Sequence, residues 1–449
     1  MSNSRPCVGY LAGSQPASGE SRASGGSGDD VRPGAGRRGS AAQVTLGSEY
    51  RRIWFGNASS NLADGITFVA LPLLAATLTQ SPLAIAGLAI AYSAPRVLSV
   101  LGIGVLIDRV DRRRLLILAN VSRAALFAAL AALVLTGTTP LAVLYVVYAV
   151  MGVLETLSDG AAFAVLPQAV EARGLDRANS QVAATQTVVD EFVGPPLGGV
   201  LFVGAAFAPS ALTAVAYLVA GFAFWRLRGT YVVPGGDGAE SPVGVLAAIR
   251  SGAVWTWHHR VVRLLVVVGA LASVAYMIPF SYLVLYARDE LGLGPTGYGL
   301  LLSFTALGGL LGAAVASRLR RRIGYGWTIV SALGVGALAF GVVSLTTNLA
   351  VVAVALALYI AHAVVWNVMA ASVRQQATPA SMMGRVGSVS RLLGLVGLTV
   401  GAIVGGLLAS AFGYLVPFAV AGGLFAVTAA MCVAQLGLFT AWERAEGTA

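Results

Sequence analysis

Long apolar runs separated by short polar turns fill most of the chain from about residue 50 onward. A helix needs about 20 mostly apolar residues to cross the hydrocarbon core of a bilayer. The runs that are long enough predict twelve membrane-spanning helices, near residues 53–77, 84–107, 115–136, 140–163, 183–206, 209–228, 262–287, 297–317, 326–346, 349–373, 386–411 and 414–438.

The polar segments outside these runs predict how the chain is divided. Residues 1–46 are rich in Gly, Ser, Ala and Pro and lack an apolar period, which is typical of a disordered tail. Residues 47–228 and 262–439 each hold six apolar runs, which predicts an N-terminal and a C-terminal six-helix bundle. We expect residues 229–261 to be a cytoplasmic linker and residues 440–449 to be a second cytoplasmic tail.

The composition excludes an ordinary soluble protein. Hydrophobic residues make up 57% of the chain and charged residues 11%, whereas a soluble domain carries roughly 25% charged residues. The net charge of +10 lies in short loops between apolar runs and offers no basic face to a nucleic acid. We therefore expect a membrane protein that is not an enzyme and does not bind nucleic acid.

The residue types also argue against a nucleotide, metal or other cofactor. All 29 basic residues are arginines, so the lysine of a phosphate-binding loop is missing and ATP is not an expected partner. Two of the three histidines are adjacent, and Cys7 and Cys432 are far apart in the sequence, so no metal site or disulfide is expected.

The arginine distribution predicts the orientation in the membrane. Loops at 80–82, 137–140 and 346–348 hold no arginine, and Arg288 is the exception on that side. Loops after the even-numbered runs hold many, namely Arg109, Arg112, Arg113, Arg114, Arg173, Arg177, Arg226, Arg228, Arg318, Arg320, Arg321, Arg322, Arg374 and Arg385. Because cytoplasmic loops carry an excess of basic residues, we expect a multi-pass protein of the cell membrane with both termini in the cytoplasm.

The two halves of the chain repeat each other. The stretch from Gly194 to Gly199 in the fifth run corresponds to the stretch from Gly401 to Gly406 in the eleventh, an offset of 207 residues. Parallel repeats of six helices are typical of one large class of secondary transporter. The predicted fold class is therefore an all-α membrane protein, with twelve transmembrane helices in two pseudo-symmetric six-helix bundles that expose a central site to either side in turn.

The loop after the second run carries the most specific motif. It reads Gly104-Val-Leu-Ile-Asp108-Arg109-Val-Asp-Arg112-Arg113, and it resembles the cytoplasmic loop signature G-x-x-x-D-R-x-G-R-R of major facilitator superfamily transporters. Asp111 stands where the family prefers glycine. The motif is either a topological anchor or a gating loop. In the gating hypothesis, Asp108 bonds Arg112 and the start of the eleventh helix and braces the outward-facing state.

From about residue 50 to residue 439 the chain resembles the drug:proton antiporter-3 branch of that superfamily, which includes macrolide and enterobactin exporters. The stretches that carry the resemblance include Asn61-Leu-Ala-Asp64-Gly65 and Met383-Gly-Arg-Val386. A further stretch resembles the fifth-helix motif of antiporters, a helix-packing element with Gly194, Pro195, Gly198 and Gly199, although Asp190 replaces its first glycine. The arginine that antiporters carry in the fourth helix is missing.

The resemblance implies a proton-coupled exporter of a hydrophobic drug-like or secondary-metabolite molecule. Its expected partners are the lipid bilayer, a small hydrophobic substrate and protons, and we expect a monomer. The alternatives are a siderophore exporter or an uptake carrier of the same fold. A transport-inactive membrane sensor or partner subunit is a further alternative, which the missing fourth-helix arginine leaves open.

Several charges fall inside the predicted helices, where each needs a partner or a wet cavity. Asp64 and Arg96 lie at the same depth of the first and second runs, which predicts an ion pair between them. By the same counting Arg123 pairs with Glu155. Asp159 follows Glu155 by four residues and shares its helix face. We interpret Asp64, Glu155 and Asp159 as candidates for proton coupling. The alternative is that the pairs are only structural braces.

Other polar and aromatic side chains are candidates for a substrate cavity. The resemblance implies that the first, fourth, seventh and tenth helices line this cavity. Its candidate lining residues are therefore Asn57, Asn61, Tyr276, His362, Trp366 and Asn367, with Phe280, Tyr282 and Tyr286 as further parts of an aromatic wall. We expect Asp190, Glu191 and Arg391 to be gate charges near the cytoplasmic ends of the fifth and eleventh helices.

Overall fold

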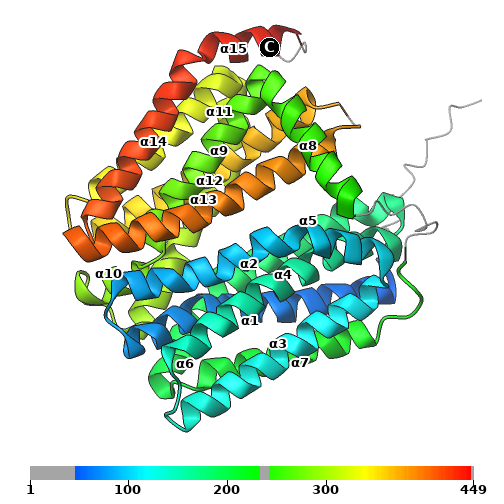
Figure 1. Ribbon diagram of the computed structural model, residues 1–449, viewed down its shortest axis with the longest axis vertical. Helices are drawn as coiled ribbons and strands as arrows, with labels where there is room; N and C mark the ends of the chain where they lie inside the picture. Colours follow the sequence, from blue (N-terminus) through cyan, green and yellow to red (C-terminus); the bar gives the residue numbers. More distant parts are fainter. Residues whose placement is uncertain (1–45, 233–241, 380, 446–449) are drawn as a thin grey trace, which may run out of the picture. The chain divides into compact units, whose positions relative to one another are not determined.

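The computed structural model describes residues 46–232, 242–379 and 381–445, and in these residues the secondary structure is helical with no strand. The predicted tail at 1–46 lies almost wholly outside the described residues. Up to residue 232 the helices are α1 (Gly47–Leu78), α2 (Pro82–Arg109), α3 (Arg112–Leu135), α4 (Leu141–Ala169), η1 (Ala172–Gly174), α5 (Leu175–Gln186), η2 (Thr187–Val193), α6 (Gly194–Gly204) and α7 (Ala208–Trp225) (Figure 1).

Eight further helices follow in the rest of the described chain. They are α8 (Pro242–His258), α9 (Arg260–Phe280), α10 (Leu283–Asp289), α11 (Pro295–Val343), α12 (Leu349–Ala377), α13 (Met383–Phe412), α14 (Val416–Ala434) and α15 (Leu436–Ala445). α8 lies within the segment 229–261 that was predicted to be a linker. The boundaries of the predicted bundles and linker remain predictions.

In the described residues, eleven helical segments are long and apolar enough to cross a membrane, one fewer than the twelve predicted runs. The difference lies in α11, whose 49 residues cover both the eighth run, 297–317, and the ninth, 326–346. Gly324 interrupts this helix with a φ of +75°, a backbone conformation that glycine adopts without steric cost.

The carboxylate of Glu443 in α15 stabilises the helical turns that follow this break. It accepts a hydrogen bond of 2.5 Å from the backbone N–H of Tyr325, the first residue after Gly324. Backbone N–H groups at the start of a helix have no partner within the helix, and an acid there also interacts favourably with the helix dipole. α15 therefore caps the second part of α11.

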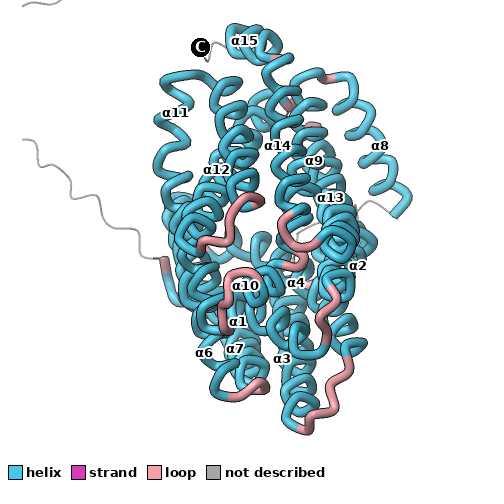
Figure 2. The backbone as a smooth tube through the Cα atoms, turned by 90° about the vertical axis from the view of Figure 1, so that its left-hand side faces the viewer, coloured by secondary structure: helices cyan, strands magenta, loops and turns pink. Residues whose placement is uncertain are grey.

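The helices of the first half pack mainly against one another, and so do those of the second half. α1 and α3 both contact α7, and α2 contacts α4, while α9 contacts α13 and α11 contacts α12 and α14. The two halves meet along two pairs of helices, α2 with α13 and α6 with α11. Figure 2 shows α2 and α13 side by side between the two groups of helices.

Hydrogen bonds join the two halves from the middle of the helices to the end that is poor in arginine. The hydroxyls of Ser93 in α2 and Thr399 in α13 lie 2.8 Å apart. Nearer the end, Nη1 of Arg288 in α10 donates to the carbonyl of Ala76 in α1 at 2.9 Å. The two halves are therefore held together by hydrogen bonds on the side of the loops at 79–81 and 290–294.

The predicted glycine motif brings α6 into direct contact with the backbone of α1. A Cβ atom on Gly194 would lie 2.6 Å from the backbone of Gly65, and one on Gly198 would lie 2.7 Å from the carbonyl oxygen of Ile66. Gly199 faces the other half, where a Cβ would meet the backbone of Pro295 and Thr296 in α11. Small residues thus allow α6 to approach closely both α1 of its own half and α11 of the other half.

We predict that Gly194→Ala destabilises the folded protein by about 1–3 kcal/mol, because the added methyl group forces α6 away from α1. Gly334→Ala is the matched control, since an added Cβ at this helical position of α11 meets nothing within 4 Å. The measurement is the thermal unfolding midpoint of each purified variant in detergent. Equal midpoints for the two variants would contradict the packing role.

Candidate functional site

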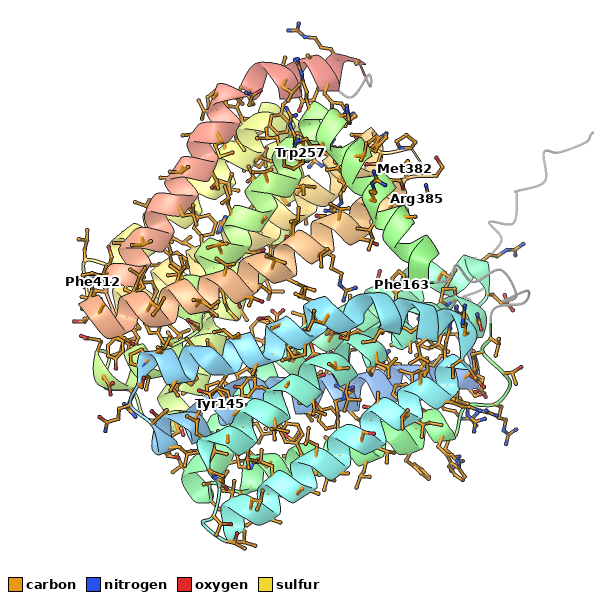
Figure 3. All side chains as sticks on the ribbon, viewed as in Figure 1. Tyr145, Phe163, Trp257, Met382, Arg385 and Phe412 are labelled. Carbon is orange, nitrogen blue, oxygen red and sulfur yellow. The ribbon has the colours of Figure 1, made fainter. Side chains whose placement is uncertain are left out.

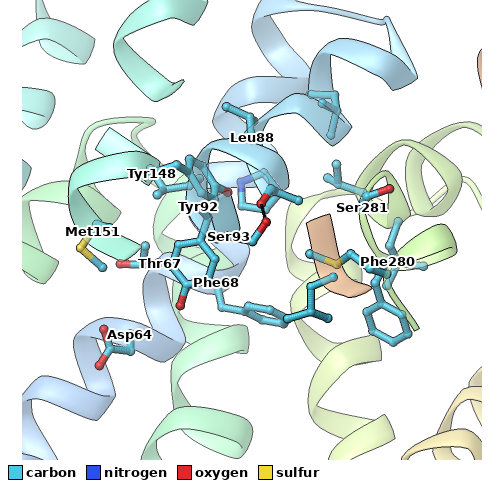
Figure 4. Close-up of a pocket in the computed structure, with 18 of the residues that line it drawn as sticks. Asp64, Thr67, Phe68, Leu88, Tyr92, Ser93, Tyr148, Met151, Phe280 and Ser281 are labelled. Atoms are coloured by element: carbon cyan, nitrogen blue, oxygen red, sulfur yellow. Dashed lines mark hydrogen bonds between the residues drawn. The ribbon is translucent and has the colours of Figure 1, made fainter. Parts of the chain in front are cut away.

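A cavity of about 350 Å³ lies between the two halves, in the middle of the membrane-spanning helices. Most of its wall is apolar and aromatic, with Phe68, Tyr148 and Met151 from one half and Tyr276 and Phe280 from the other. Figure 4 shows Phe280 across the cavity from the labelled residues of α1, α2 and α4. The charged side chains among its described lining residues come from the first half of the chain and include three acids, Asp64, Glu155 and Asp190.

Asp64 on α1 is the centre of one buried cluster. Its Oδ1 accepts a hydrogen bond of 2.6 Å from the hydroxyl of Tyr217 on α7 and lies 3.3 Å from Nη1 of Arg123 on α3. The Arg123 side chain is 1% exposed, and its guanidinium lies 4.5 Å from the centre of the Tyr217 ring. Its Nη2 also donates to Ser60 and to Asn120. One arginine therefore joins α1, α3 and α7.

Glu155 on α4 is the centre of a second cluster of the same composition. Its Oε2 accepts a hydrogen bond of 2.6 Å from the hydroxyl of Tyr92, and its Oε1 lies 3.5 Å from Nη1 of Arg96, both on α2. The guanidinium of Arg96 lies 4.7 Å from the centre of the Tyr92 ring. Each cluster therefore consists of one acid, one arginine and one tyrosine, and its acid lines the cavity.

The predicted pairing of these charges is wrong, although all four residues are paired. The sequence predicted Asp64 with Arg96 and Arg123 with Glu155, whereas the structure pairs Asp64 with Arg123 and Glu155 with Arg96. The counting of residues estimated the depth of each charge but did not determine which side chains meet. α1 barely contacts α2, because α2 packs on α4 and α13 and α1 packs mainly on α6 and α7. α3 and α4 do pack on each other, but Arg123 of α3 points toward Asp64 and Tyr217 and not toward Glu155.

Asp190, which was predicted to be a gate charge near the cytoplasmic end of its helix, lines the central cavity instead. It lies in η2, a π-helical segment, and its backbone is so close to α1 that a Cβ on Gly65 would meet it at 2.5 Å. Short π-helical segments are rare and occur frequently at functional sites. The other two predicted gate charges, Glu191 and Arg391, are exposed and do not line the cavity.

Three further polar candidates from the sequence lie outside this cavity. Asn61 donates to the backbone carbonyl of Asn57 at 2.7 Å, so this amide is bonded within its own helix. Neither asparagine is among the cavity-lining residues, and Asp159 is an exposed residue of α4 that does not line the cavity either. Of the polar candidates on the first helix, Asn57, Asn61 and Asp64, only Asp64 is among the described residues that line the cavity.

A second cavity of about 440 Å³ lies within the second half and is lined by Trp366, Asn367 and His362 of α12. Tyr276 lines both cavities. His362 is 3% exposed, and its ring packs on Phe425. Its Nε2 would lie 2.7 Å from a Cβ on Gly336 in α11. The imidazole therefore fits into the space that this glycine leaves, which is a packing role between α12, α11 and α14.

Of the predicted aromatic wall, two members lie in the central cavity and two do not. Tyr276 and Phe280 line it. Tyr282 and Tyr286 are fully buried, and both pack on Phe418.

The loop motif makes its described contacts within the first half of the chain. Arg112 is buried, and its Nη1 donates to the carbonyl of Ala164 in α4 at 3.3 Å, while Nη2 of Arg113 donates to the carbonyl of Trp225 at the end of α7. Gly104 is exposed, and Arg109 ends α2. The side chain of Asp108 lies outside the described part of the structure, so the predicted contact with the eleventh helix stays a prediction.

Asp111, which departs from the superfamily signature, has a definite structural role. It is the N-cap of α3, and its Oδ1 accepts hydrogen bonds from the backbone N–H groups of Arg113 and Tyr231. Asp111 thus makes side-chain hydrogen bonds at the start of α3 that glycine has no side chain to make.

Sequence reasoning missed the two tyrosines of the acid clusters. Tyr92 precedes Arg96 by four residues, so helical spacing alone places both on one face of α2. No comparable signal exists for Tyr217, because it reaches Asp64 from α7, 153 residues further along the chain.

The observed pairing predicts which charges are energetically coupled. Removing one partner of a buried ion pair costs roughly 3–5 kcal/mol, and removing the second costs less because the uncompensated charge is gone. We therefore expect a double-mutant cycle of Asp64→Asn with Arg123→Gln to be non-additive in thermal stability. The matched control is the cycle of Asp64→Asn with Arg96→Gln, which should be close to additive. If Asp64 were coupled more strongly to Arg96 than to Arg123, the pairing predicted from the sequence would be supported instead.

Comparison with known proteins agrees with this architecture. A family model described as transmembrane secretion effector matches residues 45–446. The chain is 30% identical to the multidrug efflux pump Tap of Mycolicibacterium fortuitum over 387 residues, which cover 80% of this chain and 89% of that protein.

Solved structures of low sequence identity share the fold. A variant of the nucleoside transporter NupG has a TM-score of 0.72 at 10% identity and covers 86% of this chain and 99% of its own. A bacterial homologue of the iron transporter ferroportin in an inward-facing state has a TM-score of 0.68 at 17% identity, with 86% and 98% covered. The chain therefore belongs to the transmembrane secretion effector family of major facilitator transporters, as a multi-pass membrane transporter of the efflux type and not an enzyme.

Proposed function

We propose that this transporter exports hydrophobic, positively charged drug-like molecules in exchange for protons. One observation carries the proposal: two clusters of an acid, an arginine and a tyrosine present their acids to an apolar cavity that both halves form. The apolar wall suits a hydrophobic molecule. The acids suit both a proton and a cation.

The charges around the cavity favour a cation over an anion. Three acids and one arginine are among the described residues that line it, and the second arginine, Arg123, lies buried behind Asp64. Two of the acids have an arginine partner, and the third, Asp190, has no ion pair among the described residues. Aromatic rings such as those of Tyr148 and Tyr276, which line the cavity, attract a cation by their π-electron faces.

Proton exchange follows from competition for the same carboxylates. A protonated Asp64 or Glu155 no longer attracts a cationic substrate, so proton uptake favours substrate release. Loss of the proton restores the charge and favours substrate binding. Rocking of the two halves about α2 with α13 and α6 with α11 would expose the cavity to either side in turn. We further propose, from the arginine-rich loops, that the protein lies in the cell membrane with both termini in the cytoplasm.

The transport assay uses ethidium, a permanent hydrophobic cation, and proteoliposomes with an imposed pH gradient. We expect wild-type protein to move ethidium against proton flow, and we expect Asp64→Asn and Glu155→Gln to reduce this flux at least tenfold, because a neutral amide cannot take up a proton. Glu171→Gln is the control, since this acid is exposed between α4 and α5 and lies outside the cavity.

Two results would overturn this mechanism. If Asp64→Asn and Glu155→Gln both transport ethidium with the pH dependence of the wild type, the two clusters have only a structural role. Absence of flux in the wild type under any gradient, for any cation tried, would favour the sensor or partner-subunit alternative.

The position of Asp190 predicts a separate effect on affinity. We expect Asp190→Asn to raise the KM for ethidium about fivefold to tenfold with a smaller change in kcat, because the variant removes an attraction made in the bound state. Glu191→Gln is the matched control, since this neighbouring acid is exposed and does not line the cavity. An equal rise in KM for both variants would indicate a general surface charge effect.

A further inference from the structure

A second feature of the molecule lies far from the central cavity, at the arginine-rich end of the second half. It is a groove of about 600 Å³ between α8, α9, α14 and α15. One part of its lining is polar and aromatic, with Trp257, Arg260 and Arg263. The other part is mostly apolar and includes Leu264, Val267, Met431, Ala434 and Leu438. Figure 3 labels Trp257 near the end of the molecule where α15 lies.

The two arginines are available to an external anion. Both are exposed, and in the described part of the chain neither makes an ion pair with an acid. Nη1 of Arg263 donates to the backbone carbonyl of Trp257 at 3.0 Å, which fixes this side chain at the groove. The two guanidinium groups are three residues apart on the first turn of α9, so they lie on neighbouring positions of one face.

The apolar part continues from these arginines along the membrane-spanning helices. Leu264 and Val267 follow Arg260 and Arg263 along α9, and Met431 lies on the adjacent α14. Trp257 is 58% exposed, and tryptophan is enriched where the headgroups of a bilayer meet its hydrocarbon core. A ligand that fits must therefore have an anionic head and a long apolar tail.

We propose that this groove binds an anionic phospholipid of the arginine-rich leaflet, with its phosphate at Arg260 and Arg263 and an acyl chain along Leu264 and Val267. Basic pockets between membrane helices recognise such headgroups by charge and by hydrogen bonds from guanidinium groups. A zwitterionic phospholipid carries the same tails but no net negative charge. Inorganic phosphate carries the charge but does not use the apolar wall.

The test measures quenching of Trp257 fluorescence by phosphatidylglycerol that carries bromine on its acyl chains. Purified full-length protein in detergent is titrated with this lipid, and the signal of Trp257→Phe is subtracted to remove the other six tryptophans. An arginine near an anionic surface contributes about 1 kcal/mol, which is about fivefold in affinity. We therefore expect Arg260→Gln with Arg263→Gln to weaken binding about 25-fold, and the corresponding double lysine variant to retain most of it.

Two further variants separate the groove from general surface charge. Arg321→Gln with Arg322→Gln removes the same charge from exposed positions of α11 outside the groove and should leave binding unchanged. Ala434→Phe fills the apolar part without changing charge and should weaken binding. The proposal is overturned if brominated phosphatidylcholine quenches as strongly, if the control pair loses as much affinity, or if inorganic phosphate alone displaces the lipid.

Discussion

A charged side chain at the centre of a membrane helix costs about 2.5–3.5 kcal/mol on insertion scales, and this cost determines how the first half of the protein is held together. Arg123 and Arg96 are 1% and 15% exposed, and each lies next to one carboxylate and over one tyrosine ring. The carboxylate compensates the charge, and the tyrosine hydroxyl occupies a further acceptor position on that carboxylate. Because the partners come from different helices, one cluster joins α1, α3 and α7, and the other joins α2 and α4.

The same clusters connect stability to transport. Their acids line the cavity between the halves, so a change in the charge of an acid alters both the contacts of its arginine and the attraction for a bound cation. The second half provides mostly apolar and aromatic surface to this cavity. A division of this kind lets one half carry the charge exchange while the other shapes the space for the substrate. Close helix contacts at Gly194 and Gly199 hold α6 against α1 of its own half and against α11 of the other half.

The sequence predicts the fold better than the site, for a physical reason. The bilayer requires each spanning segment to be apolar and long enough to cross it, and this requirement acts on each helix separately. The helical architecture is therefore predictable from the sequence, apart from the merging of two runs in α11. The depth of Asp64, Arg96, Arg123 and Glu155 is also predictable, because each residue adds a constant rise along a helix. Which helix lies beside which is set by packing between segments far apart in the chain. The exchanged ion-pair partners and the missed role of Tyr217 both follow from that limit.

The π-helical turn at 187–193 determines which way the side chain of Asp190 points. A π turn holds more residues than an α turn, and such turns sit inside otherwise regular helices. Asp190 owes its orientation to this local winding as well as to its residue type. In a regular α-helix the residue at position 190 would point in a different direction. An acid at this position therefore faces the cavity only where the helix is wound as it is here.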